Sequence, residues 1–102
     1  MAHVWKPGSY LYIFNNELFP LKGAIIIGKI TIEAEAYSKN GIEVEFYIDG
    51  VLKNTDSEYP YEWLWNEKVV GEHEIKIITY DNKGNIAKDK IDILIFNIEE
   101  IK

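Results

Sequence analysis

The feature that most constrains the fold is an alternation of apolar and polar residues that returns along most of the chain. In residues 30–36 the even-numbered positions are Ile or Ala, while the residues between them are Thr or Glu. Residues 42–48, 61–65, 72–80 and 86–96 alternate in a similar way. Successive side chains of a β-strand point to opposite faces, so a period of two predicts strands with one buried face each. No stretch shows the period of a helix.

Turn-forming residues divide these segments at intervals of about ten residues. The turns are Ser38–Gly41, Asp49–Gly50, Val70–Gly71 and Asp81–Asn85. Asp-Gly after an alternating run is typical of a tight hairpin, because both residues tolerate a positive φ angle. Short strands at this spacing predict an all-β sandwich of two antiparallel sheets with about seven strands.

The length of 102 residues predicts a single domain. We expect residues 9–98 to form the sandwich, residues 1–8 to be an N-terminal expression start or linker, and residues 99–102 to be a C-terminal tail. The segment Ser9–Phe14 is apolar on both faces, which predicts a first strand that is buried on both sides or crosses between the sheets. Pro20 predicts a bend or a sheet edge.

The composition disfavours several classes of function. The net charge is −6 and the chain has no arginine. Recognition of nucleic acids and of anionic membranes depends on basic residues, so neither partner is expected. Uninterrupted apolar runs such as Ala24–Ile27 are far shorter than the about 20 residues that cross a membrane. The absence of cysteine excludes disulfides and thiolate chemistry.

A run of aromatic residues at Tyr59, Tyr61, Trp63 and Trp65 allows two interpretations. Aromatic rings flanked by acidic residues can stack on sugars, which would make a carbohydrate-binding site. Alternatively, the last three share the inward face and fill the gap between the sheets. Tyr59 precedes the strand and is expected to stay exposed, so it is the candidate ligand-binding residue.

No metal ligand is assigned. His73 lies on the apolar face of a strand, where a single histidine is more often packed and hydrogen-bonded than a ligand or a base. The turn Asp81–Asn85 is rich in oxygen atoms, but its Gly84 is fourth in the loop, whereas the EF-hand loop has glycine sixth. We expect Asp81 and Asn85 to cap backbone amides, with calcium binding as the alternative. Helices, or a deep pocket lined by His73 with ionised neighbours, would argue against a passive module that has no cavity for chemistry.

Catalysis and a cofactor are not expected either. The acidic pairs Glu33/Glu35 and Glu43/Glu45 lie on predicted solvent faces, where nothing raises a carboxyl pKa for glycosidase chemistry. The chain shows no arrangement of Ser, His and Asp for nucleophilic catalysis, and no glycine-rich phosphate loop.

Several apolar side chains are expected on the outer face of the sheet that carries the last strands. Tyr47, Leu94 and Phe96 would lie near one end of it, and Ile78 and Tyr80 near the opposite end. Small apolar clusters are ordinary on a monomer, but neighbouring domains or subunits can also pack on them. Tyr47, Leu94 and Phe96 are therefore the candidate interaction surface.

Four segments follow one another in a recognisable order. They are Val44–Lys53, a hairpin; Tyr59–Trp65, with Pro-Tyr-x-Trp; Gly71–Ile77, with Gly-x-His; and Tyr80–Asn85, with Asp-x-x-Gly-Asn. Their sequences and spacing resemble those of bacterial and archaeal Ig-like domains. The opening residues, Lys6–Phe14, also resemble archaeal members.

This resemblance implies an immunoglobulin-like sandwich and a non-catalytic module, usually one of several in a secreted or surface-displayed protein. The leading hypothesis is a domain that spaces, stiffens or displays other domains, with neighbouring domains or surface proteins as partners. A second hypothesis is a glycan-binding module that uses Tyr59. A third is self-association into filaments or surface layers by strand addition, with Tyr10–Phe14 as the donor.

Overall fold

The computed structural model describes residues 2–38 and 41–98, and in these residues it contains ten strands and no helix. The strands are β1 (Ala2–Lys6), β2 (Tyr10–Ile13), β3 (Asn16–Pro20), β4 (Ala24–Ile27), β5 (Ile30–Ala36), β6 (Glu43–Ile48), β7 (Val51–Asp56), β8 (Tyr61–Trp65), β9 (Val69–Tyr80) and β10 (Ile86–Asn97). The prediction of an all-β fold is confirmed.

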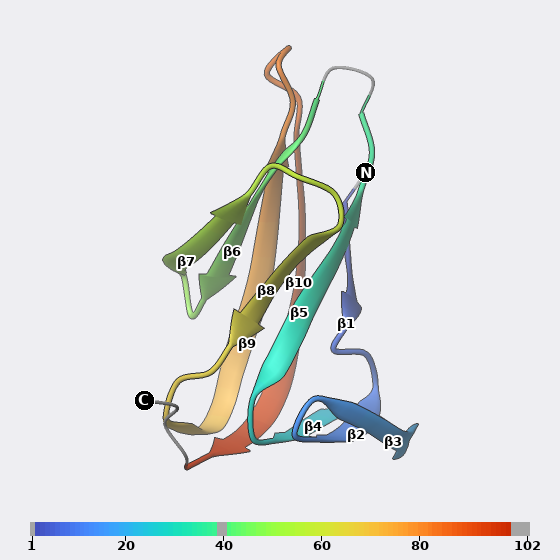
Figure 1. Ribbon diagram of the computed structural model, residues 1–102, viewed down its shortest axis with the longest axis vertical. Helices are drawn as coiled ribbons and strands as arrows, with labels where there is room; N and C mark the ends of the chain where they lie inside the picture. The colour runs from blue at the N-terminus through green and yellow to red at the C-terminus, as the bar shows by residue number, and fades with distance from the viewer. Residues whose placement is uncertain (1, 39–40, 99–102) are drawn as a thin grey trace.

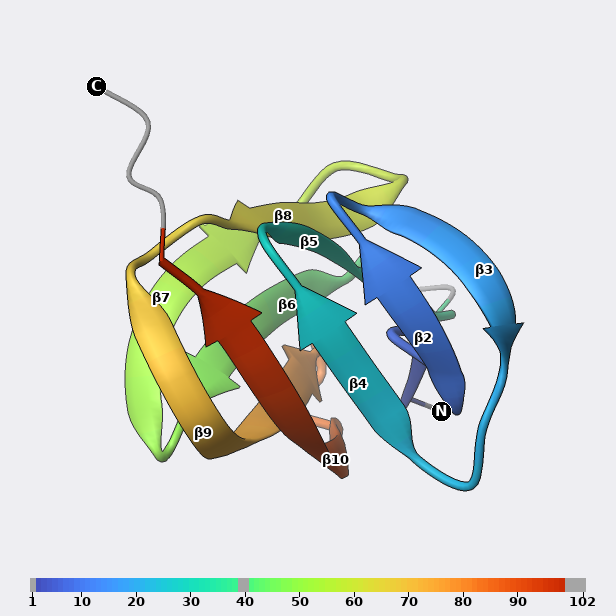
Figure 2. The same ribbon diagram turned by 90° about the horizontal axis from the view of Figure 1, so that it is seen from below.

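The strands form two sheets that pack as a sandwich (Figures 1 and 2). The small sheet has the order β1-β5-β8, and the large sheet has the order β3-β2-β4-β10-β9-β6-β7. Neighbouring strands are antiparallel except that β4 runs parallel to both β2 and β10. The long hairpin of β9 and β10, joined at the turn 81–85, forms the centre of the large sheet.

The core lies between the sheets and is built from the alternate positions that the sequence pattern marks. Its buried hydrophobic members come from both sheets: Val4, Tyr12, Ala24, Ile26, Ile30, Ile32, Ala34, Val44, Phe46, Ile48, Trp65, Ile75, Ile77, Ile93 and Ile95. Trp65 is fully buried, while Tyr61 and Trp63 are half-buried against this cluster, so the predicted inward face of β8 is confirmed. Each buried isoleucine contributes about 1.5–3 kcal/mol relative to an exposed one.

The N-terminal part of the chain differs from the expected boundary. Residues 2–6 were assigned to the leading segment 1–8, but they form β1, which pairs with β5 from Ala2–Ala36 to Lys6–Glu33. Val4 is buried in the core. The first three residues, Met-Ala-His, resemble an expression start, and for this reason residues 1–8 were not expected to belong to the sandwich. The predicted tail, residues 99–102, lies outside the described residues.

The apolar segment after β1 becomes a strand of the other sheet. Between Lys6 and Tyr10 the chain passes from the small sheet to the large one, and β2 then pairs with β3 on one side and β4 on the other. This agrees with the expected crossing between sheets, although the strand is second in the chain and not first. Pro20 ends β3, an edge strand, as predicted.

The hairpin of β6 and β7 turns at Asp49 and Gly50, where the sequence predicts it. Their φ angles are 51° and 81°. Two consecutive positive φ values match the twist of the flanking strands, and glycine adopts the second without a steric penalty. The turn Ser38–Gly41 contains the undescribed residues 39 and 40, so its geometry is outside the described part of the chain.

Candidate functional site

The outer face of the small sheet carries a hollow of about 480 Å³. Its lining includes His3, Trp5, Glu33 and Glu35 on β1 and β5, Tyr59 in the loop before β8, and the rim of the half-buried Tyr61 ring. The side chains of β1 and β5 alternate, so that His3 and the two glutamates point away from the core. We call this site the outer hollow.

Tyr59, the predicted ligand-binding residue, is 84% exposed, which confirms the expected exposure. Its ring meets the ring of Tyr61 edge-on, with centroids 5.9 Å apart and an interplanar angle of 86°. Trp5 contributes a second aromatic ring to the outer hollow and is 51% exposed. Trp5 was not among the predicted site residues, because residues 1–8 were expected to be a leading segment. The signal that could have found it is the alternation of His3, Val4 and Trp5.

Asp56, at the end of β7, fixes the loop that carries Tyr59. One of its carboxylate oxygens accepts the backbone N–H of Glu58 at 3.0 Å, and the other accepts that of Glu62 at 3.1 Å. The loop is therefore anchored on both sides of Tyr59. Because the backbone on both sides of Tyr59 is anchored, the loop loses less conformational entropy when Tyr59 contacts a ligand.

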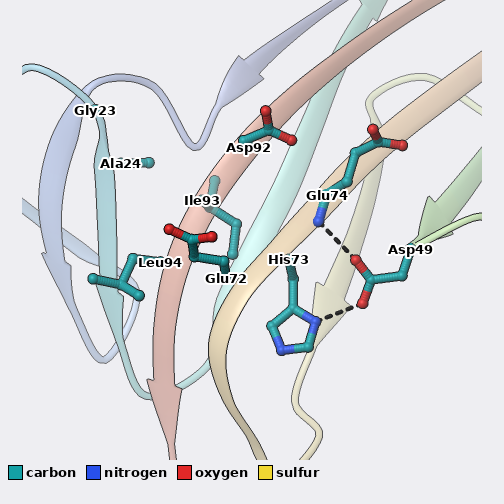
Figure 3. Close-up of a pocket in the computed structure, with 9 residues that line it drawn as sticks. All are labelled: Gly23, Ala24, Asp49, Glu72, His73, Glu74, Asp92, Ile93 and Leu94. Atoms are coloured by element: carbon teal, nitrogen blue, oxygen red, sulfur yellow. Dashed lines mark hydrogen bonds and ion pairs between the residues drawn. The ribbon is translucent and has the colours of Figure 1, made fainter.

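A second hollow, of about 560 Å³, lies at His73 and faces four carboxylates (Figure 3). The acids are Asp49, Glu72, Glu74 and Asp92. Ionised neighbours in a deep pocket at His73 would argue against a passive module. However, the Asp49 side chain is half exposed, and the His73 ring is bound on one side by Asp49 and packed on the other against Trp65. In the described residues, no group of three or more His, Cys, Asp or Glu side chains has an arrangement that could hold a metal ion.

Asp49 joins the β6–β7 turn to β9 through its carboxylate. Oδ1 accepts the Glu74 backbone N–H at 2.9 Å, and Oδ2 lies 2.5 Å from His73 Nδ1. The hydrogen bond from the Glu74 N–H is the largest cause that lowers the pKa of Asp49 below its ordinary value, and the hydrogen bond with His73 is the next largest. The interpretation of His73 as a packed, hydrogen-bonded residue is confirmed.

The turn Asp81–Asn85 is closed by the Asp81 side chain. Oδ1 accepts the backbone N–H groups of Lys83 and Asn85, each at 2.9 Å, and Oδ2 accepts the Asn85 amide at 2.8 Å and the Ser38 hydroxyl at 3.1 Å. The side-chain hydrogen bond from Asn85 is the largest cause that lowers the pKa of Asp81 to about 2. Capping of amides by Asp81 is confirmed, whereas the Asn85 side chain binds Asp81 and not an amide.

The acidic pairs lie on outer faces, as expected. Glu33 is half-buried and its carboxylate lies 3.5 Å from Lys6 Nζ, while Glu35 is exposed. Glu43 is exposed, and Glu45 accepts the Tyr47 hydroxyl at 2.7 Å. Both carboxylates of each pair lie on the same strand, and not across a cleft from one another.

The three residues of the candidate interaction surface do not lie together in the structure. Tyr47 was expected beside Leu94 and Phe96, but it lies opposite Lys76, while Leu94 lies opposite Glu72. The reason is that β6 is half as long as β9 and pairs only with the second half of it.

The hydrogen bond to Glu45 is the largest cause that raises the pKa of Tyr47 to about 12. Tyr47 therefore belongs with Glu45 and Tyr80. A side-chain hydrogen bond to Glu45 is also the largest cause that raises the pKa of Tyr80. Leu94 and Phe96 remain together and lie in register with Ile25 and Ile27 of the parallel strand β4.

The proposed strand donor, Tyr10–Phe14, is already bound within the chain. β2 pairs with β3 along one edge and with β4 along the other, and the Phe14 N–H donates to the carbonyl of Ile27 at 2.8 Å. Tyr12 is fully buried in the core. Donation of this segment to another molecule would require its removal from the centre of three strands, so the structure argues against the third hypothesis.

Two packed sheets with this strand pattern define the class as an immunoglobulin-type β-sandwich. Residues 18–77 match the family model described as bacterial Ig domain, which covers more than half of the chain. The chain therefore belongs to the bacterial Ig domain family. No curated protein matches it. Among the described residues, no helix is long and apolar enough to cross a membrane.

Solved structures with a similar fold include the fibronectin(III)-like modules of Clostridium thermocellum CbhA. The match has 29% identity and a TM-score of 0.71, and covers 97% of this chain and 100% of that one. A Jonesia denitrificans lytic polysaccharide monooxygenase matches with 18% identity and a TM-score of 0.58, over 74% of this chain and 59% of that chain.

A third similar structure is Bacteroides ovatus SGBP-B, solved in complex with a mixed-linkage heptasaccharide. It has 14% identity and a TM-score of 0.60, and the match covers all of this chain and 26% of that one. At these low identities, the monooxygenase and SGBP-B show the shared fold alone.

Proposed function

We propose that this chain is a non-catalytic module that spaces, stiffens or displays other domains of a secreted or cell-surface protein. The observation that carries the proposal is the match with the fibronectin(III)-like modules, which covers almost the whole of both chains. Bacterial Ig and fibronectin(III)-like modules generally have no catalytic role and typically occur in extracellular or surface proteins.

The position of the ends supports a spacer. The molecule measures 40 by 31 by 21 Å. In Figure 1, β1 begins in the upper half of the long axis, whereas β10 ends at its lower end. Domains attached at the start of β1 and the end of β10 would be separated along the long axis of the sandwich.

The packing supports a passive role for the sheets. The core is continuous between the sheets, and among the described residues no buried side-chain nitrogen or oxygen atom lacks a hydrogen-bond partner. Of the acids that line the His73 hollow, Glu72 and Asp92 are exposed, Asp49 accepts a backbone N–H, and Glu74 lies 3.8 Å from Lys90 Nζ. Neighbouring domains of the same protein are the partners that we propose, with Leu94 and Phe96 as their contact surface.

A tandem of two copies tests the spacer role by small-angle X-ray scattering. If the ends hold domains apart, the maximum dimension of the tandem is about twice the 40 Å length of one copy. The single copy measured under the same conditions is the control. A tandem folded side by side, with a maximum dimension near that of one copy, would contradict the proposal.

A further inference from the structure

The outer hollow is lined by two exposed aromatic rings, Trp5 of β1 and Tyr59 of the loop before β8, and by the carboxylates of Glu33 and Glu35. Exposed Trp and Tyr side chains cost solvation free energy, and two of them beside polar groups are typical of a recognition surface. We propose that the outer hollow binds a neutral glycan chain, with Trp5 and Tyr59 stacked on its sugar rings. This inference goes beyond the spacer role, which does not depend on it.

The backbone at Trp5 differs from that of the rest of β1. Val4 pairs with Ala34 and Lys6 pairs with Glu33, so Trp5 is the extra residue of a β-bulge. A bulge redirects a side chain out of the regular pleat and is frequent beside binding sites. The strand itself is anchored, because the Val4 N–H donates to Asp89 Oδ2 at 2.8 Å. Trp5 is therefore directed outward from a fixed backbone.

Tyr59 is fixed in a comparable way. Asp56 accepts N–H groups on both sides of it, and the Tyr61 ring supports it edge-on. Both aromatic residues thus project from anchored backbone and lie 54 positions apart in sequence on the same hollow. Sugar rings present apolar C–H faces that pack on aromatic rings, and a glycan chain offers several such faces in a row.

The polar groups indicate which glycans fit. Glu33 and Glu35 are acceptors for sugar hydroxyl groups, and carboxylates accept strong hydrogen bonds. Lys6 Nζ lies 3.5 Å from Glu33 and offsets its charge, so Glu35 supplies the one uncompensated carboxylate. This single charge disfavours uronic acid chains, and it is not the anionic pair that a cationic glycan would select. Neutral sugars are the class that offers hydroxyl donors to these carboxylates and carries no charge of its own.

The experiment is affinity electrophoresis of the full chain in gels that contain soluble mixed-linkage β-glucan, glucomannan, xylan, polygalacturonate or chitosan. We expect retardation by at least one neutral polymer and none by polygalacturonate. Tryptophan fluorescence gives a second readout, because Trp5 is the only one of the three tryptophans that is more than half exposed. Its emission should shift on titration with the neutral polymer.

Tyr59→Ala should weaken binding about tenfold, because one stacked ring is lost from an exposed loop without a change in the core. Tyr59→Phe keeps the ring and should bind within about twofold. Trp5→Phe should retain retardation but lose the fluorescence shift. Phe19→Ala, which removes an exposed ring from β3 of the other sheet, is the matched control and should bind as the wild type does.

Melting temperatures of all variants identify any loss of fold, and Tyr59→Ala is expected to melt as the wild type does. Four results would overturn the proposal: no retardation by any neutral polymer, unchanged retardation of folded Tyr59→Ala, equal loss in Phe19→Ala, or binding confined to chitosan or polygalacturonate. The last result would show that charge, and not ring stacking, determines which glycans bind in the outer hollow.

Discussion

His73 Nδ1 lies 2.5 Å from Asp49 Oδ2, so a residue of β9 is bound to the turn between β6 and β7. The same carboxylate accepts the Glu74 backbone N–H, and the Asp49 N–H in turn donates to the Glu74 carbonyl at 2.9 Å. Asp49 thus continues the β6–β9 pairing for one residue beyond the end of β6. The histidine serves to hold the hairpin in place.

Replacement of Asp49 should therefore loosen the hairpin. Asp49→Ala removes the acceptor of the Glu74 N–H and places alanine at a φ of 51°, where a residue with Cβ is strained. We expect a loss of about 1–2 kcal/mol in the free energy of unfolding, measured in urea. Asp49→Asn tolerates the same φ angle and keeps an acceptor, so it should lose less. Equal losses in the two variants would contradict the assigned role.

The stability of the fold should depend on pH in the acid range. The pKa of Asp81 is lowered to about 2 and that of Asp49 is also lowered, so both carboxylates bind fewer protons in the folded state than in the unfolded state. Their contribution is present above about pH 4 and is lost as the pH falls toward about 2. Urea unfolding between pH 7 and pH 2 measures it.

Asp81→Asn is the control for this pH dependence, because it removes one of the two groups. Its free energy of unfolding should fall less steeply between pH 4 and pH 2 than that of the wild type. An identical slope would show that Asp81 does not couple folding to proton binding.

Two neighbouring isoleucines of β4 test the partition of side chains between core and surface. Ile26 is fully buried and Ile27 is 38% exposed. Ile26→Ala should destabilise the fold by about 2–5 kcal/mol, because it leaves a cavity between the sheets. Ile27→Ala removes the same atoms from the outer face and should cost less than about 1 kcal/mol. Equal values from urea unfolding would contradict the assignment of the two faces.

Two glycines provide a matched pair for backbone conformation. Gly28 has a φ of 86°, and a Cβ atom there would lie 2.6 Å from Cδ1 of Phe14. Gly23 has no heavy atom within 4 Å of the corresponding position. Gly28→Ala should cost at least about 1–2 kcal/mol from the left-handed conformation alone. Gly23→Ala should change the free energy of unfolding by less than about 0.5 kcal/mol. A loss at Gly23 as large as that at Gly28 would contradict this reading of the backbone.

Much of the fold could be predicted because a period of two in the sequence records which face of a strand is buried. This holds for β5, β6, β9 and β10, whose alternation agrees with the observed burial. The strands β1, β3 and β4 were not predicted. All five residues of β3 are exposed, all four residues of β4 are apolar, and β1 has a single buried side chain, so none of the three shows a clear apolar–polar alternation.

The site was only partly predictable for a different reason. The exposure of Tyr59 follows from its place before a strand, but its neighbour Trp5 comes from a distant part of the chain through the pairing of β1 with β5. Likewise, the separation of Tyr47 from Leu94 depends on the register of β6 against β9. A single sequence indicates which face of each strand is buried, but it does not give the register in which the strands pair.

The most direct test of the central claim, that this sandwich is a mechanical spacer, is to pull on it through Ala2 and Asn97 in a single-molecule force experiment. A mechanical spacer should unfold in one abrupt step that releases roughly 300 Å of chain, because the two sheets share one core. Gradual extension at low force without such a step would contradict it.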